Sequence, residues 1–149
     1  MTASITFYNT FKEYVADGTF DLNTDTFKVA LVSSTYTFAA THSVYADLTN
    51  ELSTANGYTS GGATLASVTF SQTSGTATFD AADTTWTASG GSIVARRAII
   101  YKSGTANSRV SPLVASILME TTPAPADITV TTGNTLTLQY NASGIFTLA

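Results

Sequence analysis

The chain has 149 residues, of which 44% are hydrophobic and only 11% are charged. Ten acidic and six basic residues give a formal net charge of −4, which opposes the phosphate contacts that supply most DNA affinity, so we expect no nucleic-acid partner. The absence of cysteine excludes disulfides, thiol nucleophiles and thiolate metal sites, and no run of ~20 apolar residues is present to span a membrane.

Residues 6–17 carry the one clear amphipathic helical pattern, with Thr6 as a candidate N-cap and Gly18 as a stop. Its apolar side chains recur at helical spacing, at Phe7, Phe11, Tyr14 and Val15. Because so short a helix frays alone, we expect this stripe to pack on a sheet. Residues 1–5 are expected to form a flexible arm.

The next segment imitates the opening of a calcium-binding loop, with oxygen ligands at alternate positions in Asp21, Asn23 and Asp25. Such a loop needs Gly at position six and Glu at position twelve, where this chain has Thr26 and Val32. We therefore predict a turn before a strand at 27–32, and no metal site.

His42 is the only histidine, so it can form neither a multi-histidine metal site nor a catalytic triad without placed partners, and we interpret it as a solvated loop residue. Asn56-Gly57 predicts a tight turn. Gly61-Gly62 lacks the Gly-Lys-Ser/Thr ending of a phosphate loop and indicates a bend at a strand entry.

From residue 64 onward the pattern is of strands and turns. Threonine is the commonest residue, and its branched β-carbon suits a pleated sheet. Strands are predicted at 27–32, 64–70, 76–81, 93–101, 112–119, 128–130, 136–140 and 145–148.

Residues 79–101 hold the only tryptophan and the densest β-branched run, and they predict a central hairpin turning at Gly90-Gly91. Both faces of the arm at 93–101 carry apolar side chains, so we expect this strand to be covered on both sides. Arg96 and Arg97 should point to opposite faces, and the one that meets covered surface should have an aspartate or a subunit boundary beside it.

Asp80 and Asp83 resemble a carboxylate pair. Two carboxylates can perform acid–base or glycosidic chemistry only if an apolar cleft separates their pKa values and a substrate fits between them. A solvated turn is the simpler interpretation, and no group of residues in the chain assembles a reaction centre. We predict no enzymatic activity, no catalytic residues, no cofactor and no metal.

Several segments in a fixed order resemble small virion proteins of tailed bacteriophages: FYNTFKEY, DTFKVALVSSTYTF, YADLTNEL, NGYTSGGATL and FDAADTTWTASGGSIVARRAIIYKSG. The resemblance spans about residues 7–149. The chain departs from the family in a short STA segment before NGYTS and in the doubled Arg96-Arg97, where the family has one arginine followed by an aromatic residue.

The resemblance implies a capsid cement or decoration protein. Its expected fold is a single all-β domain over 1–149, a jelly-roll-like β-sandwich of about eight strands with one short N-terminal helix. It implies binding to the major capsid protein on the outside of the head, where the chain stabilises contacts between capsomers. It also implies a location in the virion. From the two apolar faces of 93–101 and the low content of charged residues, we expect self-association as a dimer or trimer, and the lack of a long apolar run predicts no membrane partner.

Two other functions stay open. A tail, neck or fibre-base component of the same virion is the nearer alternative. The other is a carbohydrate-binding β-sandwich, for which exposed aromatic rings would be needed, and the candidates are Tyr36, Tyr45, Tyr58 and Trp86.

Overall fold

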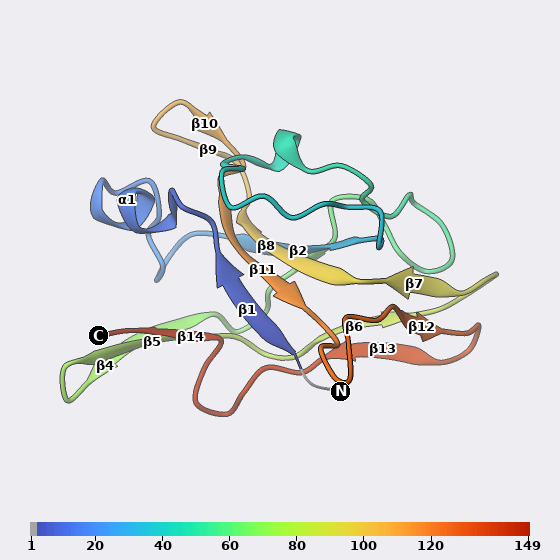
Figure 1. The fold of residues 1–149 in the computed structure, drawn as a ribbon. Coiled ribbons are helices and arrows are strands. Elements are labelled where there is room, and N and C mark those ends of the chain that lie inside the picture. Colours follow the sequence, from blue (N-terminus) through green and yellow to red (C-terminus); the bar gives the residue numbers. More distant parts are fainter. Residues whose placement is uncertain (1–2) are drawn as a thin grey trace.

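The structure, a computed structural model, describes residues 3–149, which form an all-β sandwich with one short α-helix (Figure 1). The first layer is an antiparallel sheet in the order β1-β11-β8-β2-β3. Its strands are Ser4–Phe7, Leu113–Leu118, Arg97–Lys102, Phe27–Val32 and Ala63–Thr64. β7 (Ile93–Ala95) comes just before β8 in the chain, separated from it by Arg96, and it pairs with β12 (Ile128–Val130).

The second layer consists of two antiparallel sheets that follow one another along the chain. In one, β5 (Thr76–Asp80) lies between β4 (Thr69–Thr73) and β14 (Phe146–Leu148). In the other, β6 (Thr84–Thr87) pairs with β13 (Thr135–Leu138). A small hairpin of β9 (Thr105–Ala106) and β10 (Arg109–Val110) projects beyond the first layer (Figure 1).

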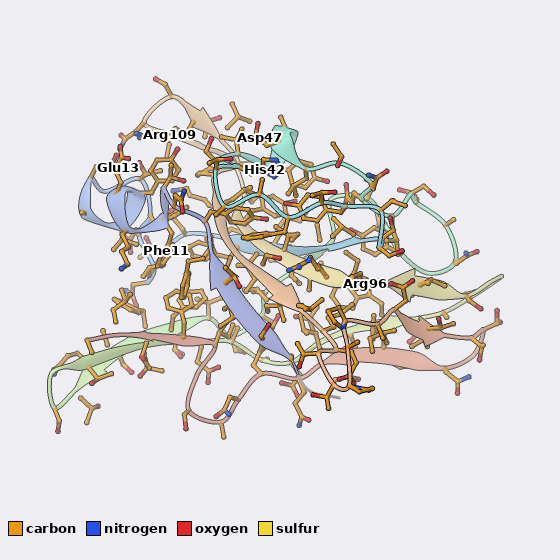
Figure 2. All side chains as sticks on the ribbon, viewed as in Figure 1. Phe11, Glu13, His42, Asp47, Arg96 and Arg109 are labelled. Carbon is orange, nitrogen blue, oxygen red and sulfur yellow. The ribbon has the colours of Figure 1, made fainter. Side chains whose placement is uncertain are left out.

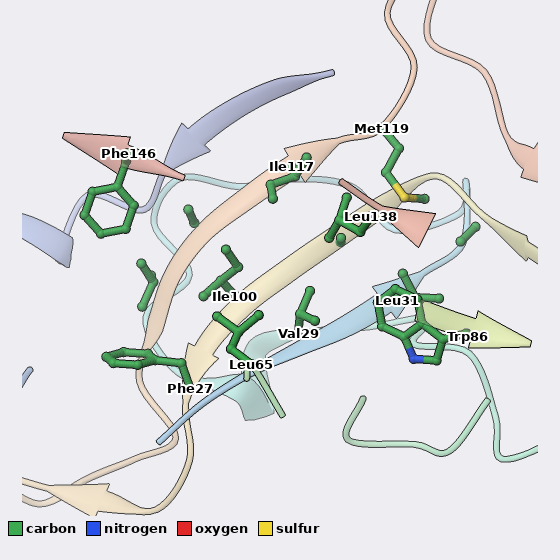
Figure 3. Packing of buried hydrophobic residues seen from close by; sticks show 14 of the residues in the cluster. Phe27, Val29, Leu31, Leu65, Trp86, Ile100, Ile117, Met119, Leu138 and Phe146 are labelled. Carbon is green, nitrogen blue, oxygen red and sulfur yellow. The ribbon is translucent and has the colours of Figure 1, made fainter. Parts of the chain in front are cut away.

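The main core lies between the two layers. In β2, Phe27, Val29 and Leu31 face it, and Trp86 and Phe146 reach it from the second layer (Figure 3). This alternation follows from the period of two in a strand, which sends every second side chain to the same face. Full burial of such side chains contributes roughly 1.5–3 kcal/mol each.

A smaller core covers the opposite face of the first layer. Its buried members are Tyr8, Ala30, Val32, Tyr36, Ile99, Tyr101 and Leu113. The segment between β2 and β3, which includes a 3-10 turn at Tyr45–Asp47, supplies Phe38, Tyr45 and Leu48 against this cluster. Because β2 and β8 are buried on both faces, the prediction of a doubly covered strand is confirmed for β8.

The predicted hairpin at 79–101 is wrong. β6 and β7 do not pair with each other within the described residues, since β6 pairs with β13 and β7 pairs with β12. The two arms belong to different layers, and the segment 128–138 supplies an antiparallel partner to each of them: β12 to β7 and β13 to β6 (Figure 1). Arg96 also interrupts the second arm, so Ile93 and Ala95 share the main core with Ala98, whereas Val94 is exposed.

The N-terminal predictions need correction. Helix α1 spans only Phe11–Ala16, because Thr6 and Phe7 belong to β1. Residues 4 and 5 are likewise paired with β11 and do not form an arm, while residues 1–2 of that predicted arm lie outside the described residues. The docking of the helix is confirmed, since Phe11 and Tyr14 are buried and the Phe11 ring stacks on Phe7 at 4.7 Å between ring centroids.

Strand number is the remaining difference. The described part of the chain holds fourteen strands where about eight were expected, because breaks at residues such as Arg96 and Ser67 divide longer extended segments. Ser67 has a φ of 52°, and Leu65, two residues before it, is buried in the core. No helix within residues 3–149 has the length and apolarity to cross a bilayer.

Candidate interaction surface

The segment at Asp21 is a hydrogen-bonded turn, as predicted. Asp21 accepts hydrogen bonds from the backbone N–H of Asn23 and from the Thr24 hydroxyl, the latter at 2.7 Å. The Thr24 hydroxyl, followed by the Asn23 N–H, holds the pKa of Asp21 below its ordinary value. Asp25 forms an ion pair with Lys102, with 2.5 Å between Oδ2 and Nζ. Within residues 3–149, no three His, Asp or Glu side chains gather closely enough to hold a metal ion.

Within the described residues, no hydrogen bond joins the side chains of Asp80 and Asp83, so the two do not form a shared site. Asp83 accepts a hydrogen bond of 2.9 Å from the backbone N–H of Tyr140. Asp80 ends β5 opposite Thr69, and its Oδ1 is buried with no hydrogen-bond partner among the described residues.

His42 is half-buried, so its interpretation as a solvated residue is wrong. Its Nδ1 lies 3.0 Å from the Tyr36 hydroxyl, which lies 3.1 Å from the Tyr8 hydroxyl. Burial raises the pKa of both tyrosines, so the hydroxyls stay neutral and able to share protons in this chain of hydrogen bonds. His42 and Asp47 both lie in the segment over the first layer (Figure 2).

A carboxylate that the sequence did not single out organises the same segment. Glu51 accepts hydrogen bonds from the Tyr58 hydroxyl at 2.7 Å and from the Gly61 N–H at 2.6 Å. The hydroxyls of Tyr45 and Ser60 donate to its other oxygen. The predicted bend at Gly61-Gly62 therefore also joins Glu51 to the chain just before β3.

The two arginines after β7 have different neighbours. An aspartate was predicted beside the arginine that meets covered surface. The aspartate lies instead beside Arg96 (Figure 2), whose ion pair with Asp127, at 2.7 Å, is exposed. Arg97 lies over the Phe38 ring, 5.2 Å from its centroid, and donates to the Ser116 hydroxyl. Both side chains hold covering segments on the sandwich.

The aromatic residues proposed for sugar binding are mostly inside the molecule. Tyr36, Tyr58 and Trp86 have 4%, 2% and 5% of their surface exposed. Tyr45 is half-buried, and its ring lies 4.6 Å from that of Tyr101. Stacking on a sugar needs an accessible ring face, so these residues do not form a binding platform.

The outer surface of the second layer is the most regular feature of the molecule. Strand pairing places one side chain of every two on this surface, and each such position carries Thr or Ser except Asp80. We call this set the threonine face; its members are Thr69, Ser71, Thr73, Thr76, Thr78, Thr85, Thr87, Thr135, Thr137 and Thr147. Most of them are exposed.

The threonines oppose one another across neighbouring strands, for example Thr85 with Thr137 and Thr87 with Thr135, whose hydroxyl oxygens lie 3.1 Å apart. Directly opposed side chains on a sheet lie close enough to form such hydroxyl pairs. The face thus presents methyl and hydroxyl groups in rows, with a single carboxylate at one end. The sequence signal was the alternation of threonine in 76–78, 85–87 and 135–137.

Charged residues gather elsewhere. Arg109 lies 4.3 Å from the centre of the Tyr14 ring and forms ion pairs with Glu13 and Asp17, joining the β9–β10 hairpin to α1 (Figure 2). Lys102, Arg96 and Arg97 belong to the first layer or to the bend between its strands.

Comparison of the chain with family models, with curated proteins and with solved structures finds no match.

Proposed function

We propose that this chain is a non-enzymatic structural subunit that decorates the head of a tailed bacteriophage, where the threonine face binds the shell. The observation that carries the proposal is the set of threonine and serine side chains at every position of that face except Asp80, together with the resemblance of the sequence to small virion proteins. Thr and Ser side chains can make close contacts and hydrogen bonds with a protein surface without the cost of removing a charge from water.

The stabilising effect follows from mass action. A subunit that binds only the assembled shell, across the boundary between neighbouring capsid subunits, stabilises that shell by its binding free energy at every site. The partner is the major capsid protein, and the chain itself associates as a dimer or trimer. Its location is the outer surface of the capsid in the virion.

The alternatives differ in their support. A tail, neck or fibre-base component of a virion can use the same threonine face, so it remains the second candidate. A carbohydrate-binding module lacks accessible rings at Tyr36, Tyr58 and Trp86. A glycosidase needs two carboxylates flanking a substrate, and Asp83 is instead bonded to the backbone of Tyr140.

Co-sedimentation with phage heads tests the proposal. The purified chain is mixed with precursor and expanded heads of the phage that encodes it, and the bound fraction is measured over a range of concentrations. We expect tighter binding to expanded heads, because the spacing of shell subunits changes on expansion and a ligand distinguishes two states only where its contacts differ.

Matched variants assign the surface. Thr85→Lys and Thr147→Lys place a charge on each sheet of the threonine face, and each is expected to weaken head binding at least tenfold. Thr41→Lys, at an exposed position over the first layer, should bind like the unaltered chain. Binding to tails alone would move the function to the tail, and equal binding by all variants would remove the threonine face from the proposal.

A further inference from the structure

The sandwich is open along one side. There β1 is the edge strand of the first layer, and β11 is its one partner among the described residues. The segment 138–145, which links β13 to β14, forms the corresponding edge of the second layer. A groove of about 390 Å³ separates the two edges and is lined by Ile5, Ile117, Leu138, Tyr140 and Ile145, among others.

Ile5 is one of the apolar side chains that line this groove. It is paired with Ile117, which faces the main core, so Ile5 points to the same side of the sheet. Unlike Ile117, it is 36% exposed, which makes it one of three large hydrophobic residues exposed on the described surface. The main core therefore ends at this edge with an apolar side chain that no part of residues 3–149 fully covers.

The β1 edge also lacks the usual protection against pairing. Natural edge strands carry lysine, proline, a bulge or a covering segment. β1 has the sequence SITF, with regular pairing to β11 from Ser4 to Phe7, and none of the described residues that line the groove is Asp, Glu, Lys or Arg. On the opposite side of the sandwich, the chain crosses from β3 to β4 and buries Leu65.

We propose that β1 pairs with β1 of a second copy of this chain, antiparallel across a two-fold axis, to form a dimer. The hydrogen-bonding edge of an antiparallel strand is complementary to itself under a two-fold rotation, so an identical strand is a suitable partner. Because the edge and groove carry no carboxylate, two chains with a net charge of −4 can meet there without opposing like charges at the contact.

The geometry of the pair centres on Ile5. If Ile5 lies opposite its own copy, the two side chains stand about 4.5–5.5 Å apart between Cβ atoms and close the two grooves against each other. The two first layers then form one continuous sheet. This arrangement leaves the threonine face free, and it stands independently of head binding, although it specifies how the proposed self-association occurs.

Cysteine cross-linking tests the arrangement directly, because the chain has no cysteine of its own. Ile5→Cys under mild oxidation should give a disulfide-linked dimer, since directly opposed residues of an antiparallel pair have Cα atoms about 4.5–5.5 Å apart, which is within the range that a disulfide spans. Val94→Cys is the matched control, because Val94 is an exposed apolar residue on β7, outside the groove. Cross-linking at Val94 and not at Ile5 would overturn the proposal.

Sedimentation equilibrium provides the second measurement. The unaltered chain should be a dimer at tens of micromolar, and Ile5→Lys should weaken the dimer at least tenfold by placing two like charges opposite each other. Ser71→Lys, on the β4 edge of the second layer, should leave the dimer intact. A monomeric unaltered chain, or a dimer lost only with Ser71→Lys, would contradict pairing through β1.

The same variants separate this inference from the proposed function. Ile5→Lys is assayed for head binding alongside Thr85→Lys, with circular dichroism to show that both are folded. A monomeric Ile5→Lys chain that still binds heads through each subunit supports both proposals. A dimer that is retained in Thr85→Lys, together with unchanged head binding, removes the threonine face and leaves the β1 interface standing.

Discussion

Glu51 holds the segment over the first layer through a single half-buried carboxylate. Its oxygens accept hydrogen bonds from Tyr58, from Gly61 and from two further hydroxyls. Tyr58 is 2% exposed, and its hydroxyl also accepts a hydrogen bond from the N–H of Leu31, near the end of β2. The carboxylate therefore connects the covering segment to the most buried strand of the sheet.

Replacing Glu51 should be costly. Glu51→Ala leaves the Tyr58 hydroxyl and the Gly61 N–H without their acceptor, and hydrogen bonds to a charged group contribute about 1.5–3 kcal/mol each, so we expect a loss of roughly 3 kcal/mol in unfolding free energy. Glu13→Ala, at an exposed ion pair with Arg109, should change it by less than about 1 kcal/mol. Urea denaturation measures both, and equal effects would show that the Glu51 cluster does not stabilise the fold.

The raised pKa values of two buried tyrosines lead us to expect that the free energy of unfolding falls at alkaline pH. Burial, assisted by the charge of Glu51, raises the pKa of Tyr101 from 10.0 to about 12, and burial raises the pKa of Tyr140 to about 12. Below pH 10 both phenols are neutral whether the chain is folded or unfolded, so their stabilising effect is fully present. Between pH 10 and 12 the unfolded chain loses these protons and the folded chain keeps them, so stability falls as pH rises.

The expected decline is roughly 1 kcal/mol per pH unit for each such tyrosine. The decline is measured by urea unfolding midpoints from pH 8 to pH 11.5. Tyrosinate absorbance is recorded at the same time. Tyr101→Phe removes one of the titrating groups, so its midpoint should fall less steeply above pH 10 even if it starts lower. A midpoint independent of pH over this range would mean that these phenols ionise in the folded chain.

Two tight turns between elements differ in how closely a neighbouring segment packs against them. Gly57 and Gly75 both have φ near +87°, at +88° and +86°, and both follow a residue with positive φ, as a two-residue turn requires. A Cβ on Gly57 would lie 2.0 Å from the Thr87 carbonyl oxygen, whereas a Cβ on Gly75 would meet open space. The first turn is pressed against β6, and the second is free.

Alanine at these two positions should separate backbone strain from packing. Gly75→Ala is expected to cost about 1–2 kcal/mol, the penalty for a left-handed residue with a side chain. Gly57→Ala carries the same penalty and also forces the turn away from Thr87, so we expect it to cost at least ~1–3 kcal/mol more. Thermal unfolding of both variants gives the difference, and equal melting temperatures would contradict the contact.

Local patterns predicted the elements that local interactions determine. The strand at 27–32 was predicted with its observed bounds, because its side chains alternate and both faces are apolar. The turn at Asn56-Gly57 followed from residues that tolerate positive φ. The helix was predicted too long, because Phe7 fits a helical stripe and also packs on Phe11 from the neighbouring strand.

Pairing between distant segments was beyond these patterns. The hairpin at 79–101 failed because its arms pair with 128–138, and nothing local specifies that choice. Glu51 was missed because a carboxylate near tyrosines is not a motif until the segment closes on itself. The threonine face was readable in principle, since its alternation is present in 76–78, 85–87 and 135–137, but it became a surface only when strand pairing placed these segments together.

The whole molecule divides into two unlike sides. The segment between β2 and β3 covers the outer face of the first layer. It is held there by Glu51, by Arg97 and by the hydrogen bonds that join Tyr8, Tyr36 and His42. The outer face of the second layer has no such cover and carries threonine in rows. We interpret the covered side as the one that keeps the fold rigid, and the threonine face as the one that meets a partner.

The most direct test of this account is cryo-electron microscopy of intact virions of the tailed bacteriophage that, on our proposal, encodes the chain. We expect density for the sandwich in many symmetry-related copies on the outside of the head, with the threonine face against the shell and β1 beside β1 of a neighbouring copy. Density restricted to the tail, or copies on the head whose threonine face points away from the shell, would contradict the account.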